Sequence, residues 1–206
     1  MIHLAENDAL AKGGGRTIYP HPDDDNIVIK IHHTYRKGRM HAFHLLFSSK
    51  RRRFRSLINS MIEVDEFAAI VARNEFKPQF ISQFLGFTNT TIGVGAMFEA
   101  IRNPNGALAD TLLAHAASHE VEPAMINAID EFWDAVIASR AAISDSNLSN
   151  LVVTGNAVEG YELVLIDGLG DQTFIPLQSF SKRIHNARAD RKREKMKQAY
   201  RDAVKG

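Results

Sequence analysis

Three oxygen-bearing side chains flank two short apolar runs between residues 145 and 167. Asp145 precedes Asn150 by five residues, an apolar run follows Asn150 directly, and a second run at 161–166 ends on Asp167. If the two runs form a hairpin, all three side chains come to one end of it. Asp145 then suits a base for a hydroxyl group, and the oxygens of Asn150 and Asp167 suit magnesium, a hard cation. Asp and Asn are also ordinary turn residues, so the order and spacing carry this interpretation.

A lysine and a glycine-rich turn near the start of the chain could contact phosphate. Gly13, Gly14 and Gly15 let the backbone approach a ligand and turn its N–H groups toward phosphate oxygens, although three glycines alone more often mark a flexible hairpin turn. No Gly-Lys-Ser/Thr follows, so the segment is not a Walker A loop. Lys30 interrupts the β-branched run 27–31, and a charge inside such a strand needs a partner.

Glu63 is a candidate partner for Lys30. Between residues 54 and 73, apolar side chains recur at helical spacing, and they are Leu57, Met61, Val64, Ala68 and Val71. This pattern predicts an amphipathic helix with Glu63 on its middle turn. A solvated glutamate is the plain alternative, and Glu66, about one turn later, is a rival.

The remaining elements are expected in a strand-rich half followed by a helical half. The strand-rich half is expected to hold three short strands within 10–32, with turns at 12–17 and 22–26, and two more strands at 80–87 and 92–99, joined by 89–91. Residues 102–106 read as a hinge. The helical half is expected to hold helices at 108–119 and 123–142, the strand pair described above, and a basic helix from about residue 179 or 181.

Composition narrows the class of protein. The 206 residues are 45% apolar and 24% charged, as in an ordinary globular protein. No apolar run approaches the roughly 18 residues that a membrane-spanning helix needs. The first residues lack the basic and apolar regions of a signal peptide, and the chain has no cysteine for disulfides or thiolate chemistry. We therefore expect a cytoplasmic protein without a membrane span.

The net charge of +1 hides a strong segregation of charge. Residues 31–55 hold eight Lys/Arg and no acid, and residues 182–206 hold ten Lys/Arg against three acids. The interval 56–181 holds sixteen Asp/Glu and four Lys/Arg. The basic segments could contact a polyanion, chiefly from Lys50 to Arg55 and through the C-terminal helix. We favour the plainer reading, in which they fold onto the acidic body or stay solvated.

In this order, the glycine turn, strand lysine, helix glutamate, hinge, Asp-x4-Asn loop and strand-terminal Asp-Gly resemble the protein-kinase-like superfamily. The chain is most similar to the small bacterial YrbL family, which is named after the PhoP regulatory network. Three stretches carry the similarity. They are Gly-Gly-Arg-x2-Tyr-x-His-Pro-Asp-Asp at 14–24 with Ile-Lys-Ile at 29–31, Leu-Ser-Asn-Leu at 148–151, and Ile-Asp-Gly-Leu-Gly-Asp-x-Thr-Phe-Ile-Pro-Leu at 166–177.

The resemblance implies an α+β protein with a reduced protein-kinase-like bilobal fold. Residues 1–102 would form an N-terminal antiparallel sheet lobe with one helix, and residues 103–206 a small helical lobe with the catalytic-loop hairpin. The implied cofactors are ATP and Mg²⁺. The implied ATP-binding residues are Gly13, Gly14 and Gly15 over the phosphates, Lys30 on the α/β-phosphates, Glu63 orienting Lys30, and Glu99 and Ile101 in the adenine-side hinge. The implied catalytic residue is Asp145, with Asn150 and Asp167 as metal ligands.

The implied function is Mg-ATP-dependent phosphoryl transfer to a hydroxyl acceptor. The motifs depart from those of protein kinases, because Ile143-Ser144-Asp145 replaces His-Arg-Asp, Asp167-Gly-Leu replaces Asp-Phe-Gly, and no Ala-Pro-Glu follows. The acceptor hydroxyl is therefore left open between a small molecule, a sugar, a nucleic acid and a protein. Two alternatives remain: a nucleotide-binding pseudokinase with a regulatory role, and a polyanion-binding module that acts through the basic segments.

Overall fold

The computed structural model describes residues 1–13, 15–33, 57–170 and 181–205. These residues form two compact units. The first unit comprises Met1–Val64 and Gln83–Ala100, and the second comprises Asp65–Ser82 and Ile101–Gly206. The secondary structure is α+β, as expected, with antiparallel strand pairing and four α-helices among the described residues.

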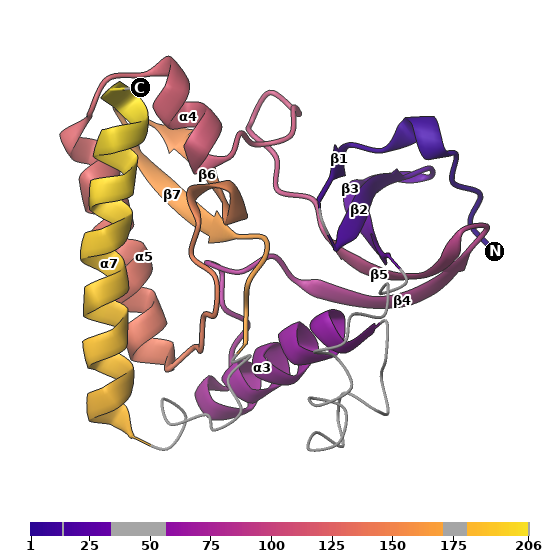
Figure 1. Ribbon diagram of the computed structural model, residues 1–206, viewed down its shortest axis with the longest axis horizontal. Coiled ribbons are helices and arrows are strands. Elements are labelled where there is room, and N and C mark those ends of the chain that lie inside the picture. The colour runs from indigo at the N-terminus through magenta and orange to yellow at the C-terminus, as the bar shows by residue number, and fades with distance from the viewer. Residues whose placement is uncertain (14, 34–56, 171–180, 206) are drawn as a thin grey trace, which may run out of the picture. The chain divides into compact units, whose positions relative to one another are not determined.

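The first unit is built on one five-stranded sheet with the order β1-β2-β3-β5-β4, in which all neighbours are antiparallel (Figure 1). The strands are β1 (Ala11–Lys12), β2 (Arg16–His21), β3 (Asp24–His32), β4 (Phe84–Thr90) and β5 (Gly93–Glu99), and a short 3-10 turn, η1 (Glu6–Asp8), precedes them. One side of the sheet buries a small core of Leu4, Tyr19, Ile29 and Ile31. The central strand β3 thus carries the β-branched run that the sequence singled out.

Two strand boundaries differ from the sequence prediction. The expected turn at 22–26 is shorter, because β3 begins at Asp24, which pairs with His21. The strand expected at 80–87 is β4, which runs over Phe84–Thr90. Residues 80–82 belong to the second unit, where Ser82 N donates to Leu165 O and Leu165 N donates to Phe80 O, both at 2.9 Å. Residues that pair over so large a distance in the sequence show no local sequence pattern, so this pairing was not predicted.

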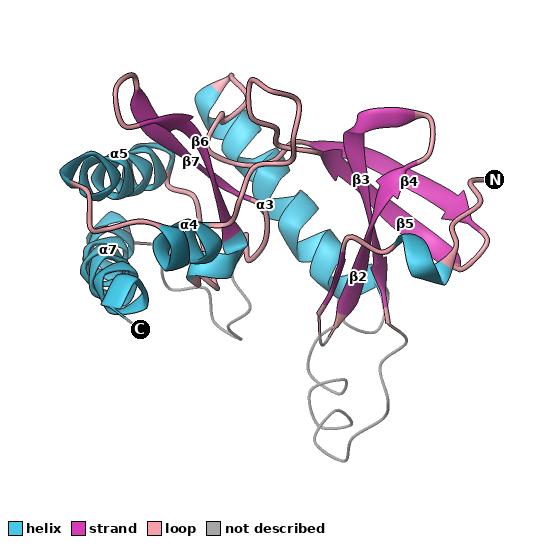
Figure 2. Cartoon of the chain, turned by 90° about the horizontal axis from the view of Figure 1, so that it is seen from above, coloured by secondary structure: helices cyan, strands magenta, loops and turns pink. Residues whose placement is uncertain are grey.

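The second unit surrounds a two-stranded hairpin with helices (Figure 2). Its elements are the later part of α3 (Ile58–Asn74), then α4 (Leu112–Ser118), α5 (Pro123–Ser139), η3 (Leu148–Asn150), β6 (Leu151–Asn156), β7 (Gly160–Leu165) and α7 (Lys182–Lys205). Trp133 on α5 is 1% exposed and packs edge-on against Phe132, with ring centroids 5.5 Å apart. The apolar face of α5 therefore lies in the core of this unit.

Two helix boundaries also differ from the prediction. The helix expected at 108–119 begins at Leu112, because Thr111 is its N-cap and accepts a hydrogen bond from Ala114 N at 3.1 Å. The helix expected at 123–142 ends at Ser139, since Arg140 adopts the left-handed conformation with φ 57°. The basic helix begins at Lys182. No helix in the described ranges is long and apolar enough to cross a membrane.

The tight end of the β6–β7 hairpin depends on glycine. Gly155 has a φ of 80°, and a Cβ there would come 2.2 Å from Gly160 O. Gly106 has a φ of 83°, but a Cβ there would meet no atom of the described residues within 4 Å. Both positions require the left-handed conformation, but only Gly155 combines it with a steric clash.

We expect Gly155→Ala to lower the free energy of unfolding by roughly 2–4 kcal/mol, because backbone strain and overpacking add up. Gly106→Ala, the matched control, should lower it by only about 1 kcal/mol. Urea unfolding of the three proteins measures the difference. Equal losses of unfolding free energy in the two variants would show that the hairpin accommodates a Cβ at position 155 without any penalty from overpacking.

Candidate functional site

In the first unit, the structure pairs Lys30 with the glutamate chosen from the sequence. Lys30 lies on β3 opposite Ala96 of β5, and only 3% of it is exposed. Its Nζ is 3.5 Å from Oε2 of Glu63, which is also buried. A buried charge of this kind is tolerated because it is paired. The structure therefore brings together two of the predicted ATP-binding residues.

Two residues that the sequence analysis did not single out complete this cluster. Arg16 Nη2 lies 2.9 Å from Glu63 Oε1, the second oxygen of the carboxylate. Lys30 Nζ lies 3.8 Å from the centroid of the Phe98 ring, a cation–π contact. Phe98 stands two residues from Ala96 on β5, so that it shares a sheet face with Lys30. Arg16 directly follows the glycine turn, which is the one sequence signal that could have pointed to it.

His32 lies on the same face of β3 as Lys30, two residues further along the strand. Its Nε2 is 2.6 Å from Ser60 Oγ, and the two share a hydrogen bond. Burial, and then the charge of Arg16, lower the pKa of His32 from its ordinary value of 6.5 to about 4. The imidazole is therefore neutral at neutral pH.

The glycine turn links β1 to β2. Gly13 N donates to Arg16 O at 2.9 Å, and Gly15 O accepts from His33 N at 3.0 Å. Among the described residues, no atom lies within 4 Å of a Cβ built at Gly15, so these residues leave open space beside it. Gly14 lies outside the described residues.

The two residues assigned to the hinge fall into different units. Glu99, at the end of β5, pairs with Ile27, and its amide donates to Gln83 O at 2.9 Å in the first unit. Ile101 belongs to the second unit, where its carbonyl accepts from Ala109 N at 2.9 Å. The structure therefore places each within the backbone hydrogen bonding of its own unit.

Glu66, the rival partner of Lys30, has other contacts in the second unit. Its Oε1 accepts from Arg73 Nη2 at 3.2 Å and from Ala142 N at 3.0 Å. Burial raises the pKa of Glu66, while the bond from Ala142 and the charge of Arg73 oppose that rise. Glu66 thus helps to hold the segment that leads from α5 into the Asp145 loop.

The Asp145 loop pairs with the backbone that follows Asp167. Ser144 N and Asp145 N donate to Gly168 O, at 2.8 and 3.3 Å. Ser144 Oγ donates to the same oxygen at 2.9 Å. Two residues away, Gly170 N donates to Ala142 O at 2.7 Å. These bonds hold the two loops side by side.

Asn150 lies at the end of the β6–β7 hairpin opposite its turn, directly before β6 begins. Ile166 N donates to Asn150 O at 2.9 Å, and Gly168 N donates to Oδ1 of Asp167 at 2.5 Å. Gly168 has a φ of 87°, and a Cβ there would come 2.2 Å from Asp145 O, so this close approach requires glycine. The backbone therefore gathers Asp145, Asn150 and Asp167 at one end of the hairpin, as their spacing predicted.

The donor chemistry of these residues suits a hard cation. Asn150 and Asp167 offer an amide oxygen and a carboxylate, and magnesium commonly takes one or two such ligands and completes its shell with phosphate and water. Within the described part of the chain, no three His, Asp or Glu side chains form a metal-binding group by themselves. Asp145 is exposed, and its Oδ1 accepts from Asn147 N at 3.1 Å in a local turn.

Helix α7 adds a residue that the sequence analysis did not single out. Lys192 Nζ donates to Ile143 O at 2.6 Å and to Ser144 O at 3.0 Å, directly before Asp145. Nothing in the sequence distinguishes Lys192 from its neighbours, because it is one of ten Lys/Arg in a basic helix. The contact joins elements that are 48 residues apart.

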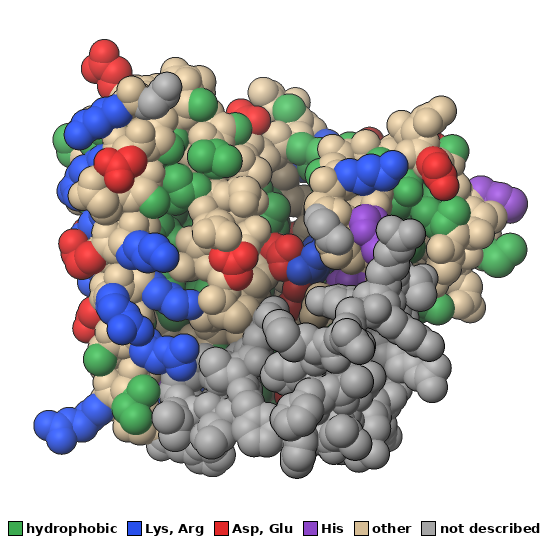
Figure 3. All heavy atoms as spheres, in the orientation of Figure 1, with side chains coloured by type: hydrophobic (Ala, Val, Ile, Leu, Met, Phe, Trp, Pro, Cys, Tyr) green, Lys and Arg blue, Asp and Glu red, His purple; other side chains and the backbone are tan. Residues whose placement is uncertain are grey.

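The C-terminal basic segment is partly engaged within its own unit. Arg193 Nη2 lies 2.5 Å from Asp134 Oδ1, and Lys197 Nζ lies 2.5 Å from Asp130 Oδ1. The bond to Asp130 raises the pKa of Lys197. Figure 3 shows further Lys and Arg side chains gathered along α7. The other predicted polyanion contact, residues 50–55, lies outside the described residues.

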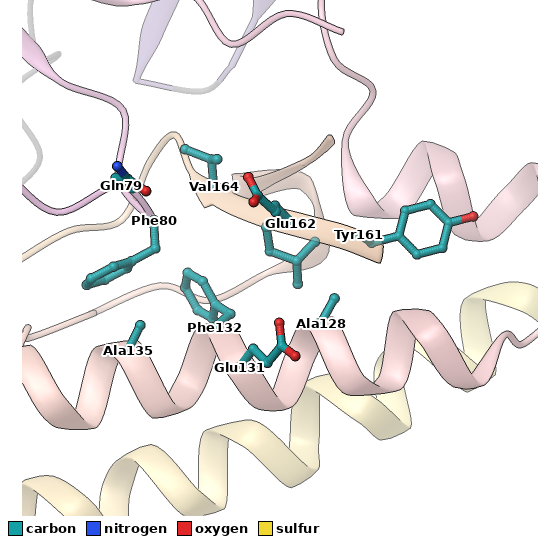
Figure 4. Close-up of a pocket in the computed structure, with 10 residues that line it drawn as sticks. Gln79, Phe80, Ala128, Glu131, Phe132, Ala135, Tyr161, Glu162 and Val164 are labelled. Atoms are coloured by element: carbon teal, nitrogen blue, oxygen red, sulfur yellow. The ribbon is translucent and has the colours of Figure 1, made fainter. Parts of the chain in front are cut away.

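A pocket of about 150 Å³ lies between α5 and β7 (Figure 4). Phe80 and Phe132 form part of its wall, with ring centroids 5.9 Å apart, and Glu131 and Glu162 add carboxylates to an otherwise largely apolar lining. None of the predicted site residues lines this pocket. It is therefore separate from the Asp145 loop and the Lys30 cluster.

Together these features define an α+β protein with a paired lysine in one unit and a loop with several oxygen-bearing side chains in the other. A family model described as "PhoP regulatory network protein YrbL" matches residues 2–201. The chain belongs to this YrbL family. A search of the curated proteins found no match.

The depressed pKa of His32 predicts a loss of stability in acid. Between pH 6.5 and about 4 the unfolded chain binds more protons at this residue than the folded protein, so the free energy of unfolding falls as the pH is lowered through that window. His32→Gln should flatten this part of the curve. Urea unfolding at several pH values measures it, with the exposed His3→Gln as the control. Parallel curves for His32→Gln and the unsubstituted protein would contradict the assignment.

Proposed function

We propose that the protein binds ATP with magnesium and transfers a phosphoryl group to a hydroxyl acceptor. One observation carries the proposal: the Asp145 loop is hydrogen-bonded to Gly168 directly after Asp167, at the hairpin end where Asn150 lies. Phosphoryl transfer requires a base that orients the acceptor hydroxyl, and oxygen ligands that hold the metal ion at the phosphates.

Each of these residues has one task in the proposed reaction. Asp145 orients the acceptor hydroxyl and accepts its proton, a task that suits its exposure. Asn150 and Asp167 hold magnesium, which neutralises charge on the phosphates. The backbone bonds from Ser144 and Asp145 to Gly168 fix the base relative to the metal ligands, and positioning of this kind supplies much of the rate in phosphoryl transfer.

The first unit supports the nucleotide part of the proposal. Glu63 holds the ammonium of Lys30 in place, and an anchored lysine can contact phosphate without first losing conformational freedom. None of the described residues would crowd a Cβ at Gly15, so as far as they extend a phosphate group can approach the backbone of the turn. The proposal includes a reduced protein-kinase-like bilobal fold. The antiparallel sheet of the first unit and the helices around the β6–β7 hairpin in the second unit are compatible with it.

Nucleotide binding is tested by thermal unfolding. At about 100 times the dissociation constant, Mg-ATP should stabilise the native state by about 2.7 kcal/mol and raise the melting temperature by roughly 5 °C or more. Lys30→Met and Asp167→Asn should each remove most of this ligand-dependent shift, and the exposed Lys77→Met should keep it. Each shift is measured against the same variant without ligand, because Lys30→Met also leaves Glu63 with one cation fewer. An unchanged melting curve at millimolar Mg-ATP would remove the basis of the proposal.

Phosphoryl transfer is tested separately from binding through Asp145→Asn. This substitution removes the negative charge with little change of shape, and Asp145 coordinates no metal in the proposal, so the affinity for Mg-ATP should stay within about three-fold. Transfer or basal ATP hydrolysis should fall by roughly 100-fold or more. Asp23→Asn, at another exposed turn aspartate, is the control. Normal turnover in folded Asp145→Asn would refute the catalytic role, and binding without any turnover in the unsubstituted protein would identify a pseudokinase.

A further inference from the structure

Helix α7 packs against other helices of the second unit along most of its length. Near its start, His185 is buried, with Nε2 3.3 Å from Val136 O of α5. Near its end, Tyr200 is fully buried in the same core as α4 and α5. The ion pairs of Arg193 and Lys197 with α5 lie between these points. Figure 1 shows the resulting side-by-side packing of α7 and α5.

From this packed helix, Lys192 contacts the loop that leads to Asp145. Lys192 is half-buried, and its ammonium donates to two consecutive carbonyls, Ile143 O at 2.6 Å and Ser144 O at 3.0 Å. Hydrogen bonds from a charged donor are about twice as strong as those between neutral groups. The next residue in the chain is Asp145.

The Asp145 loop is therefore held from two directions. On one side its amides donate to Gly168 O, and on the other side its preceding carbonyls accept from Lys192. A surface loop without regular pairing opens easily, so each added bond lowers the population of open conformations. The hydrogen bonds that the loop's N–H groups donate to Gly168 O, and those that its carbonyls accept from the Lys192 ammonium, together restrict the motion of the loop.

We propose that Lys192 is a positioning residue that anchors the Asp145 loop to the C-terminal helix. The catalytic part of this inference rests on the proposed function, whereas the anchoring part does not. It also gives the basic C-terminal segment a role within the fold: Lys192 orders the candidate catalytic loop, while Arg193 and Lys197 pair with α5. Lys192 touches neither substrate nor metal in this account and acts through the backbone before Asp145.

Three variants test the proposal. Lys192→Met keeps most of the aliphatic stem and removes the ammonium, Lys192→Arg keeps a charged donor, and Lys195→Met removes an exposed charge less than one helical turn away. The first readout is amide hydrogen exchange at Ser144 and Asp145, whose N–H groups are bonded to Gly168. In Lys192→Met these amides should exchange roughly 10-fold faster or more, while the core of α5 stays protected.

The second readout is turnover. In Lys192→Met, kcat should fall by roughly 10-fold or more, while the affinity for Mg-ATP changes by less than about three-fold. Lys192→Arg should recover much of the loss, and Lys195→Met should behave like the unsubstituted protein in both readouts. A general loss of stability would instead change exchange throughout the unit.

The outcomes separate this proposal from the proposed function. Unchanged exchange at Ser144 and Asp145 in Lys192→Met would overturn the anchoring. Faster exchange with unchanged kcat would overturn the positioning role and leave the proposed function intact. If the unsubstituted protein binds no Mg-ATP and turns nothing over, the proposed function fails and the positioning role fails with it, while local exchange still decides the anchoring.

Discussion

The carboxylate of Glu63 is buried between two cations, and the arrangement of the first unit follows from the need to keep it paired. An unpaired charge in such a position costs several kcal/mol. Arg16 reaches the carboxylate from β2, Lys30 reaches it from β3, and Glu63 comes from α3. Phe98 on β5 covers the ammonium of Lys30. A shift of either strand by one residue would turn its cation to the opposite face of the sheet, so the ion cluster and the strand register support one another.

In the second unit, hydrogen bonds restrain a polar loop, residues 144–145, instead of a buried charge. These bonds involve backbone groups: the carbonyl of Gly168 receives two amides and a hydroxyl from residues 144–145. Glycine at this position permits an approach that any side chain would block. Asp145 is thereby left exposed on a fixed backbone, whereas Lys30 is buried and fixed through its side chain. The two units thus restrain their candidate site residues in different ways.

Much of this arrangement could be predicted from the sequence because it depends on local patterns. The apolar runs on either side of 157–159 indicated the hairpin, and the strand lysine indicated a buried partner. Boundaries set by distant pairing were missed. Helix α5 ends early where the chain turns to pair with residues 169–170, and residues 80–82 pair with Leu165 instead of beginning β4. Lys192 was missed for the same reason, since only the fold distinguishes it from other basic residues. The roles assigned to the site residues stay predictions.

The placement of Trp133 makes the two units distinguishable by spectroscopy. It is the single tryptophan of the chain, and it lies in the core of the second unit. An indole in an apolar core emits at shorter wavelength than one in water, so tryptophan fluorescence, excited selectively over tyrosine, reports on the unfolding of that unit. Circular dichroism reports on both. Superimposable transitions by the two signals would mean that the units unfold as one, and separated transitions would mean that each is a cooperative domain.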